Sequence, residues 1–276
     1  METYALEALV IDDSSADDTF ERSEALRRRE ELPFPVTVLV NPRNLGYGGN
    51  QKVGYHYAIE NGFDFVVLLH GDGQYAPEVM GDLMAPLANG TAEAVFGSRM
   101  LTSGGALRGG MPYYKYVGNK ILTWFENRAL RTRLSEFHSG YRVYSVAALA
   151  KIPFDLNTDD FHFDTEIIVQ FVIAGLRIAE RPIPTYYGDE ICHVDGLAYA
   201  WNVVRAVLLA RAQEMSLFYE RKYDCAPSDL SNEHYQPKHD YASPHSLAFA
   251  EVPPRSKVLD LGCAGGAMGA WLREQK

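Results

Sequence analysis

The chain of 276 residues has few cysteines, no long apolar run and a deficit of positive charge. Its three cysteines, Cys192, Cys225 and Cys263, lie far apart and form no CxxC pair, so neither a zinc site nor a disulfide framework is predicted. Thiols without partners are typical of a reducing compartment. No apolar stretch approaches the ~20 residues of a membrane span, and METYALEALVIDD lacks the pattern of a signal peptide. We expect a cytoplasmic protein, soluble or peripheral to a membrane.

The charge balance is acidic, with 26 Lys and Arg against 36 Asp and Glu and a net charge of −10. A nucleic-acid binder is more often basic, so nucleic acid is not an expected partner. A nucleotide can still bind through a divalent metal, because the metal supplies the positive charge. With 47% hydrophobic residues the chain can bury one sizeable core, or one domain and part of another.

Strand-like and helix-like segments alternate over the first hundred residues. The expected strands are 6–12, 36–41, 63–70 and 92–99, and the expected helices are 16–31, 48–61 and 77–88. This alternation predicts an α/β fold with a mostly parallel sheet that helices cover on both faces. Beyond Arg99 the pattern indicates a loop at 103–110, helices at 113–130, 164–174 and 197–219, a strand-like segment at 139–144 and an edge strand within 176–187.

Polar side chains follow each of the four expected strands. In chain order they are Asp12 and Asp13, then Asn41 and Asn44 with Gly46 just beyond them, then His70, Asp72 and Gln74, and last Arg99. Ligands of open parallel sheets bind at the carboxyl ends of the strands, so we expect these groups to converge. Carboxylate and amide oxygens suit Mg²⁺ or Mn²⁺, and arginine suits phosphate. The pattern therefore predicts a site for a metal and a phosphate.

Each group also has a purely structural interpretation. Asp12 and Asp13 stand before an expected helix, as capping residues do. The glycines around Gly46 and Asp72 are typical of turns. His70 alone fits a hydrogen-bonded residue at a strand end, and Arg99 alone fits a surface ion pair. The metal site is favoured because all of these groups occur at successive strand ends.

A family resemblance rests on seven segments in order. They are VIDDSSADDT, NLGYGGN, LLHGDGQYAPE, GSR, SGYRVYS, FHFDTEIIVQ and RPIP. This set resembles the inverting family 2 glycosyltransferases of the GT-A fold over residues 5–220, above all the branch with dolichyl-phosphate mannosyltransferase and the bacterial polyprenyl-phosphate glycosyltransferases. The resemblance implies a metal-dependent transfer, with inversion, from a UDP- or GDP-sugar to a polyprenyl phosphate. Two alternatives stay open: a soluble saccharide or secondary-metabolite acceptor, and an inactive sugar-nucleotide-binding fragment.

The resemblance also implies roles for single residues. Asp12 and Asp13 match acids that contact the nucleotide, with Asn44 and Gly46 beside them on the donor side. Asp72 matches the acid that holds Mg²⁺ or Mn²⁺ in the family. Gln74 matches a position that can complete the metal shell.

Arg99 matches an arginine that lies near the phosphates in the family. Arg142, Asp164 and Glu166 match residues on the acceptor side of the active site. A lipid phosphate is already an anion at neutral pH, so we expect Asp164 and Glu166 to position groups rather than to act as bases. Their structural alternative is the preference for acids at a helix N-terminus.

Two features depart from the family pattern. His70 stands where the first acid of the metal motif is usual, although an imidazole can also ligate Mn²⁺. The family begins with a strand before the Asp12 strand, and here that strand is expected to be missing. We therefore expect weaker donor binding than in a complete relative.

The end of the chain indicates a second domain. We expect the glycosyltransferase at 1–222, a linker at 223–254 and a new domain from 255 to 276. VLDLGCAGG (258–266) resembles the first motif of class I SAM-dependent methyltransferases, which implies SAM contacts from Asp260, Gly262 and Gly265 in an intact parent protein. The structural alternative is a bare strand and turn.

The expected helix at 197–219 is amphipathic. Its apolar stripe is Leu197, Trp201, Val204, Leu208, Met215 and Phe218, beside Arg205, Arg211, Arg221 and Lys222. Such a helix suits a membrane surface, the protein core or a dimer. His193, just before it, is a further candidate metal ligand, with an ordinary loop histidine as the favoured alternative.

Overall fold

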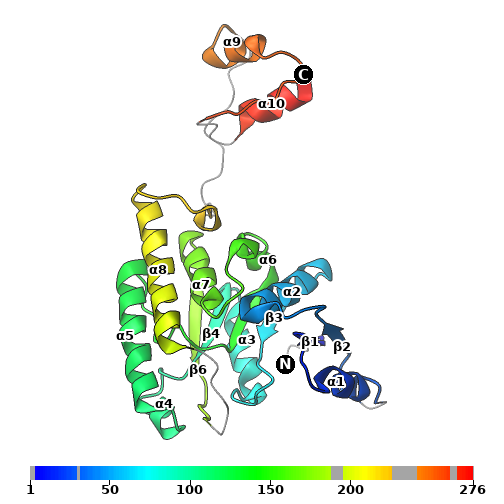
Figure 1. Cartoon of the computed structure of the whole chain (residues 1–276), viewed down its shortest axis with the longest axis vertical. Coiled ribbons are helices and arrows are strands. Elements are labelled where there is room, and N and C mark those ends of the chain that lie inside the picture. Colours follow the sequence, from blue (N-terminus) through cyan, green and yellow to red (C-terminus); the bar gives the residue numbers. More distant parts are fainter. Residues whose placement is uncertain (1–3, 30–31, 188–194, 226–240, 262–265, 276) are drawn as a thin grey trace. The chain divides into compact units, whose positions relative to one another are not determined.

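The computed structural model describes residues 4–29, 32–187, 195–225, 241–261 and 266–275 (Figure 1). The chain divides into two compact units, Met1–Ala226 and Pro227–Lys276. The first unit ends four residues beyond the expected boundary at 222, because Tyr223 and Cys225 are buried in its core. No described helix is long and apolar enough to cross a membrane.

The first unit begins with a two-stranded parallel sheet. β1 (Ala8–Asp12) pairs with β2 (Val36–Val40), in a register from Ala8 opposite Val36 to Asp12 opposite Val40. A parallel pair needs a crossover connection, and α1 (Thr19–Arg27) lies within it. This sheet confirms the two strands expected at 6–12 and 36–41.

A second sheet has four strands in the order β3-β5-β4-β6. They are β3 (Phe65–Leu68), β5 (Arg142–Ser145), β4 (Ala94–Ser98) and β6 (Ile178–Pro182). β5 runs antiparallel to both of its neighbours, so β3, β4 and β6 share one direction. The expected mostly parallel sheet is therefore confirmed, with one reversed strand. β6 lies at an edge, as its prolines predict.

Helices follow the strands as the alternation predicts. The main ones in the first unit are α2 (Gly46–Glu60), α3 (Met80–Ala88), α5 (Tyr113–Leu130), α7 (Phe163–Ile173) and α8 (Gly196–Glu214). Short helical segments are η1 (Pro77–Val79), α4 (Gly105–Arg108), α6 (Val146–Leu149), η2 (Phe154–Leu156) and η3 (Arg221–Tyr223). α5 has the expected bounds, whereas α4 lies inside the expected loop. α8 ends five residues before 219, where Ser216 has a φ of 57°.

The core lies on both faces of the four-stranded sheet. Phe96 and Tyr144 belong to a cluster with α2, α7 and α8, and their strand neighbours Val95 and Val143 belong to another with Leu83 of α3. Adjacent strand residues point to opposite faces, so each strand contributes to both clusters. This arrangement confirms helices on both sides of the sheet.

The expected apolar stripe of α8 does not face the core. Leu197 and Trp201 are 86% and 67% exposed, and α8 instead buries Val203, Ala206, Val207 and Ala210. Small side chains let α8 pack closely against α5 and α7, with which it makes its main contacts. Of the three uses that this stripe suited, packing against the protein core is therefore wrong, and a membrane surface or a dimer stays a prediction.

The second unit contains α9 (Pro244–Glu251) and α10 (Ala267–Gln275), whose Phe249 and Trp271 rings stack at 3.8 Å. α9 lies within the range expected to be linker. The strand expected at the start of VLDLGCAGG is wrong: residues 256–260 form no strand, and Leu259 is 84% exposed. A strand needs hydrogen bonds from a neighbouring strand, and the described part of this unit has none. Asp260 is exposed, and Gly262 and Gly265 lie outside the described residues, as does His193.

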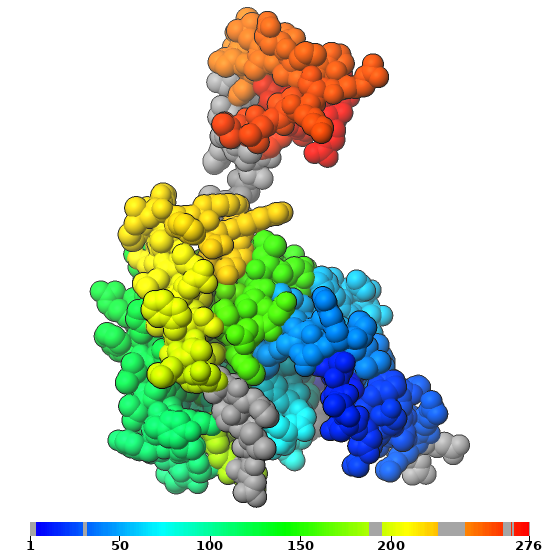
Figure 2. All heavy atoms as spheres, in the orientation of Figure 1, coloured from blue at the N-terminus to red at the C-terminus, as the bar shows by residue number. Residues whose placement is uncertain are grey.

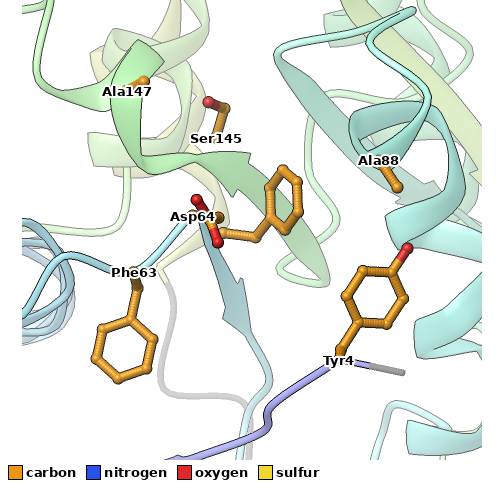
Figure 3. Close-up of a pocket in the computed structure, with 7 residues that line it drawn as sticks. Tyr4, Phe63, Asp64, Ala88, Ser145 and Ala147 are labelled. Carbon is orange, nitrogen blue, oxygen red and sulfur yellow. The ribbon is translucent and has the colours of Figure 1, made fainter. Parts of the chain in front are cut away.

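A cavity of about 390 Å³ lies at the start of β3, lined by Tyr4, Phe63, Asp64, Phe65, Ala88, Ser145 and Ala147. Figure 3 shows the side chains of Tyr4 and Phe63 at its margin. The groups with metal chemistry stand at the opposite, carboxyl end of β3. This cavity is therefore not the site that the sequence predicts.

Candidate active site

The turn after β3 presents His70 and Asp72. Gly73 has a φ of +73°, a conformation that favours glycine, and the Asp72 carboxylate accepts a 3.0 Å bond from the Gln74 backbone N–H. His70 Nδ1 lies 4.0 Å from Asp72 Oδ2. The Asp72 side chain is 40% exposed and that of His70 25%. The turn thus brings an imidazole and a carboxylate together at an accessible position.

Tyr47, in the first turn of α2, orients the His70 ring. Its hydroxyl donates to Asp164 Oδ2 at 2.9 Å and lies 3.3 Å from His70 Nε2. Because the hydroxyl proton goes to Asp164, His70 Nε2 is assigned as the donor to the Tyr47 oxygen. Nδ1 then carries the lone pair, on the side of Asp72. Burial also lowers the pKa of His70, which keeps the ring neutral at pH 7.

Gly140 makes room for the same ring. A Cβ at Gly140 would lie 2.4 Å from His70 Cε1, so only glycine fits beside the imidazole. The Gly140 N–H donates to the Tyr75 hydroxyl at 2.8 Å, and the Tyr75 ring meets His70 edge to face. Packing therefore restrains His70 on several sides.

Asp164, at the start of α7, connects this turn to the protein interior. It accepts bonds from Tyr47 and Gln51, and its Oδ2 lies 3.3 Å from Arg142 NH2. Arg142 is 1% exposed and also donates to the carbonyls of Ser139 and Phe137. The structure thus brings together four predicted site residues, Asp72, Asp164, Arg142 and His70. Arg142 lies behind the others and is enclosed.

Glu166 has different partners. Two residues along a helix turn the side chain by about 200°, so Asp164 and Glu166 point to different sides of α7. Glu166 lies 2.5 Å from Lys222 Nζ and accepts the Thr158 N–H at 2.7 Å. These contacts join α7 to η3 and to the loop before α7. The two acids, expected together on the acceptor side, are placed apart.

The acids after β1 bind backbone groups. Asp13 accepts the N–H groups of Leu45 and Gly46 at 2.8 and 3.0 Å, and the Asn41 amide at 2.7 Å. It therefore lies at the N-terminus of α2, where an anion is favoured. Asp12 is 5% exposed and accepts the Ser15 N–H. Neither acid caps α1, which begins only at Thr19.

The glycine motif before α2 allows close packing. Asn44 accepts the Gly46 N–H at 3.0 Å, and Gly46 has a φ of +79°. A Cβ at Gly48 would lie 2.4 Å from the Thr158 carbonyl oxygen. The glycines thus let α2 begin against residues 158–163. The donor contacts expected from Asn44 and Gly46 stay predictions.

Arg99, after β4, forms a buried ion pair rather than a surface one. Its Nε donates to Glu136 Oε1 at 2.9 Å, its NH1 donates to the Tyr187 hydroxyl, and its NH2 bonds both Glu136 and the His138 carbonyl. Glu136 also accepts the Asn119 amide. These bonds fix the guanidinium beside the site, and its contact with a diphosphate stays a prediction.

The donor atoms fit a divalent cation that a substrate shares. Among the described residues there is no group of three or more His, Cys, Asp or Glu side chains that could hold a metal alone. His70 Nδ1 and Asp72 Oδ2, 4.0 Å apart, can both reach one ion at the usual distance of about 2.1 Å. Mg²⁺ commonly binds with one or two protein ligands, phosphate oxygens and water. Gln74 is in the same turn, and its place in the metal shell stays a prediction.

Two residues of the site, Tyr47 and Glu136, are not indicated by the sequence patterns. Tyr47 links His70 to Asp164, and Glu136 neutralises Arg99. Tyr47 stands within the glycine motif NLGYGGN, and this position is the sequence signal that could have indicated it as a site residue. Glu136 lies 37 residues beyond Arg99, and no local pattern connects them.

Comparisons with known proteins agree with this fold. The sequence profile described as Glycosyl transferase family 2 matches residues 2–152. An undecaprenyl-phosphate mannosyltransferase from Micrococcus luteus is 28% identical over 222 residues, which cover 73% of this chain and 87% of that one. A UDP-N-acetylglucosamine–dolichyl-phosphate N-acetylglucosaminyltransferase from Methanococcus voltae is 27% identical over 190 residues, with 66% and 75% covered.

Coverage of other relatives is smaller. A low-salt glycan biosynthesis hexosyltransferase from Haloferax volcanii is 29% identical, and the match spans 62% of this chain but 40% of that protein. The crystal structure of glucosyl-3-phosphoglycerate synthase from Mycobacterium tuberculosis with Mn²⁺ and UDP-glucose has a TM-score of 0.53 at 19% identity, covering 77% of this chain and 69% of that one. The latter likeness concerns the fold alone.

These matches are to glycosyltransferases, so the methyltransferase resemblance of 258–266 gains no support from them. The profile covers more than half of the 276 residues. The chain therefore belongs to glycosyl transferase family 2, a family of transferase enzymes, and has its GT-A-like α/β fold.

Proposed function

We propose that this protein transfers a sugar, with inversion, from a UDP- or GDP-sugar to the phosphate of a polyprenyl phosphate, in the cytoplasm or at the cytoplasmic face of a membrane. Family membership supports glycosyl transfer. The names of two relatives support the acceptor, since they specify undecaprenyl phosphate and dolichyl phosphate. The synthase crystallised with Mn²⁺ and UDP-glucose supports a metal and a nucleotide-sugar donor.

The observation that carries the proposal is the paired position of His70 and Asp72. Their ligand atoms are 4.0 Å apart at the carboxyl end of β3, where open α/β sheets bind ligands. Tyr47 and Asp164 support the imidazole in the tautomer whose free nitrogen is on the Asp72 side. A carboxylate behind a ligating histidine is a common support of metal sites.

His70 and Asp72 would hold a divalent cation, which would supply positive charge to the leaving nucleoside diphosphate. Tyr47 keeps the ring of His70 in place. The acceptor phosphate oxygen attacks the anomeric carbon from the face opposite the diphosphate. The new C1–O bond forms as the bond to the diphosphate breaks, and the electron pair leaves with the nucleoside diphosphate.

No proton has to be removed from a phosphate anion, so the chain needs no general base for this acceptor. Asp164 then acts through Tyr47 and Arg142 as a positioning residue. Its carboxylate is the acceptor of the Tyr47 hydroxyl and the counter-ion of a buried guanidinium. Glu166 serves the packing of α7 against η3.

Turnover tests the proposal. The protein is incubated with labelled UDP-glucose or GDP-mannose and Mn²⁺, with undecaprenyl phosphate in detergent or with a soluble saccharide as acceptor. We expect labelled lipid product, no product in EDTA, and loss of product in Asp72→Ala. Asp82→Ala, which removes an exposed carboxylate from α3, is the matched control. Product with the soluble saccharide alone would show that the acceptor is not a lipid phosphate. Donor binding without turnover would show that the protein is a sugar-nucleotide-binding domain and not an enzyme.

A further inference from the structure

The outer face of α5 is apolar and aromatic. Tyr113 and Tyr114 are each 73% exposed, Ile121 is 60% exposed and Trp124 is 68% exposed, with Val117 between them. At about 100° per residue these five side chains occupy one side of the helix. A groove of about 440 Å³ lies on that side. It is lined by Val117, Ile121 and Trp124 together with Tyr116 and Lys120. A contiguous exposed apolar face of this kind marks an interaction surface.

The charges on this face are basic. Lys120 and Arg128 are exposed on the same side of α5, whereas Arg131, directly after the helix, is paired with Glu214 of α8 at 3.3 Å. The one acidic residue within α5, Glu126, has 0% exposure. The chain as a whole carries a net charge of −10, so a basic face runs against its average composition. The electrostatics of the face therefore favour an anionic partner.

We propose that the outer face of α5 docks on the surface of an anionic lipid bilayer. Tyr and Trp side chains prefer the boundary between hydrocarbon and water, and Lys and Arg beside them attract anionic headgroups. A second copy fits less well. In a two-fold dimer the face meets itself, which would bring Lys120 and Arg128 against other cations with no acid of α5 to match them. Figures 1 and 2 show α5 at the side of the first unit away from β1 and β2.

The inner face of α5 contacts residues next to the candidate active site. Asn119 donates to Glu136, the partner of Arg99, at 2.9 Å. Glu126 accepts a 3.1 Å bond from Thr165, the neighbour of Asp164. One helix, about 10 Å thick, thus separates the apolar face from the site network. The biological use of the docking rests on the proposed lipid-phosphate acceptor, because docking would bring such an acceptor near the site.

α8 offers the alternative surface that its sequence suggested. Leu197, Trp201 and Leu208 are exposed on it, with Arg205 between them. Asp195, before the helix, is an exposed acid, whereas Glu214 in its last turn is paired with Arg131 and Arg211. The Asp195 carboxylate would repel anionic headgroups. The exposed cations of α5 have no exposed acid on their own helix, so α5 has the charge that fits the bilayer better.

Tryptophan fluorescence locates the docking surface. The three tryptophans of the chain are Trp124 on α5, Trp201 on α8 and Trp271 on α10. The full chain is mixed with vesicles of phosphatidylcholine and phosphatidylglycerol, without donor or acceptor. We expect a blue shift that is absent in Trp124→Phe and retained in Trp201→Phe. A shift that survives Trp124→Phe and disappears in Trp201→Phe would overturn the assignment to α5.

Vesicle co-sedimentation measures the affinity of the protein for the vesicles. We expect Ile121→Ser with Trp124→Ser to lower binding at least about tenfold. Lys120→Gln and Arg128→Gln should each lower it about fivefold, the equivalent of ~1 kcal/mol per charge. Leu26→Ser, an exposed leucine on α1, should leave binding unchanged. All of these positions are exposed, and circular dichroism checks that each variant is folded.

The outcomes separate this inference from the proposed function. Vesicle binding without sugar transfer would support the α5 surface and contradict the acceptor. Sugar transfer to lipid in detergent without vesicle binding would contradict the α5 surface alone. If the wild-type protein is a dimer that does not bind vesicles, and the Ile121→Ser, Trp124→Ser variant is a monomer, the partner of the α5 face is a second copy of the chain and not a bilayer.

Discussion

The Tyr47 hydroxyl lies between His70 and Asp164, 3.3 Å from the imidazole Nε2 and 2.9 Å from the carboxylate. The three residues come from α2, the turn after β3, and α7. Through Tyr47 a buried acid is thus connected to an accessible imidazole. The arrangement sets the tautomer of His70 and with it the atom that can ligate a metal.

Tyr47→Phe removes this connection without changing the volume of the ring. We expect Mn²⁺ affinity to fall about tenfold, the usual effect of losing an outer partner of a metal ligand. Tyr57→Phe is the control, because Tyr57 lies on the same helix and donates to Glu7, away from the site. Calorimetric titration with Mn²⁺ in the presence of nucleotide measures both. Equal affinities in the two variants would contradict the role of Tyr47.

Metal binding should depend on pH through His70. Only the neutral imidazole binds a cation, so protons compete with Mn²⁺. Burial lowers the pKa of His70 below the ordinary 6.5, and we expect affinity to stay constant as pH falls to 6.5 and to decline only below it. In His70→Asp the decline should move to still lower pH, where a carboxylate is protonated. The same profile in wild type and His70→Asp would exclude His70 as a ligand.

Loss of the Asp164 charge should lower turnover, whereas loss of the Glu166 charge should lower the free energy of unfolding. Asp164→Asn removes the charge next to Tyr47 and Arg142, and we expect turnover to fall at least about tenfold. Glu166→Gln removes a charged acceptor from Lys222 and the Thr158 N–H, so the free energy of unfolding should fall by ~1–3 kcal/mol. Turnover per folded molecule should not change in Glu166→Gln. A loss of turnover as large as that of Asp164→Asn would place Glu166 in the active site.

Two glycines of α2 should respond oppositely to alanine. In Gly48→Ala the new Cβ would be 2.4 Å from the Thr158 oxygen, and we expect a loss of ~1–3 kcal/mol in the free energy of unfolding. In Gly54→Ala the new Cβ meets Ile11 at an ordinary 3.5 Å, and alanine favours the helix by up to ~1 kcal/mol. Chemical denaturation measures both. A stable Gly48→Ala protein would mean that the glycine is not needed for packing.

The sequence predicted the parts of the fold that local patterns determine. The range of α5 and the polar ends of β1 to β4 follow from hydrophobic periodicity and turn residues. The reversed direction of β5 does not, because strand pairing joins residues far apart in the chain. The sequence also left open which face of α8 packs on the core, because a helix packs by shape as well as hydrophobicity, and here small residues face the core.

The candidate site shows the same division. Asp72 and His70 were predictable because a strand and a glycine turn place them together. The pairing of Arg99 with Glu136 and of Asp164 with Tyr47 depends on tertiary contacts between residues 37 and 117 positions apart. Asp164 and Glu166 could have been separated by helical geometry alone, since two residues on one helix point in different directions.

Metal-dependent donor binding tests the central claim most directly. The protein is titrated calorimetrically with UDP-glucose and with GDP-mannose, first with Mn²⁺ and then with excess EDTA. We expect that one donor binds only with Mn²⁺, that Asp72→Ala lowers this affinity at least about 100-fold, and that Asp82→Ala retains it. Equal binding in EDTA, unchanged binding in Asp72→Ala, or no binding of either donor to the folded protein would contradict it.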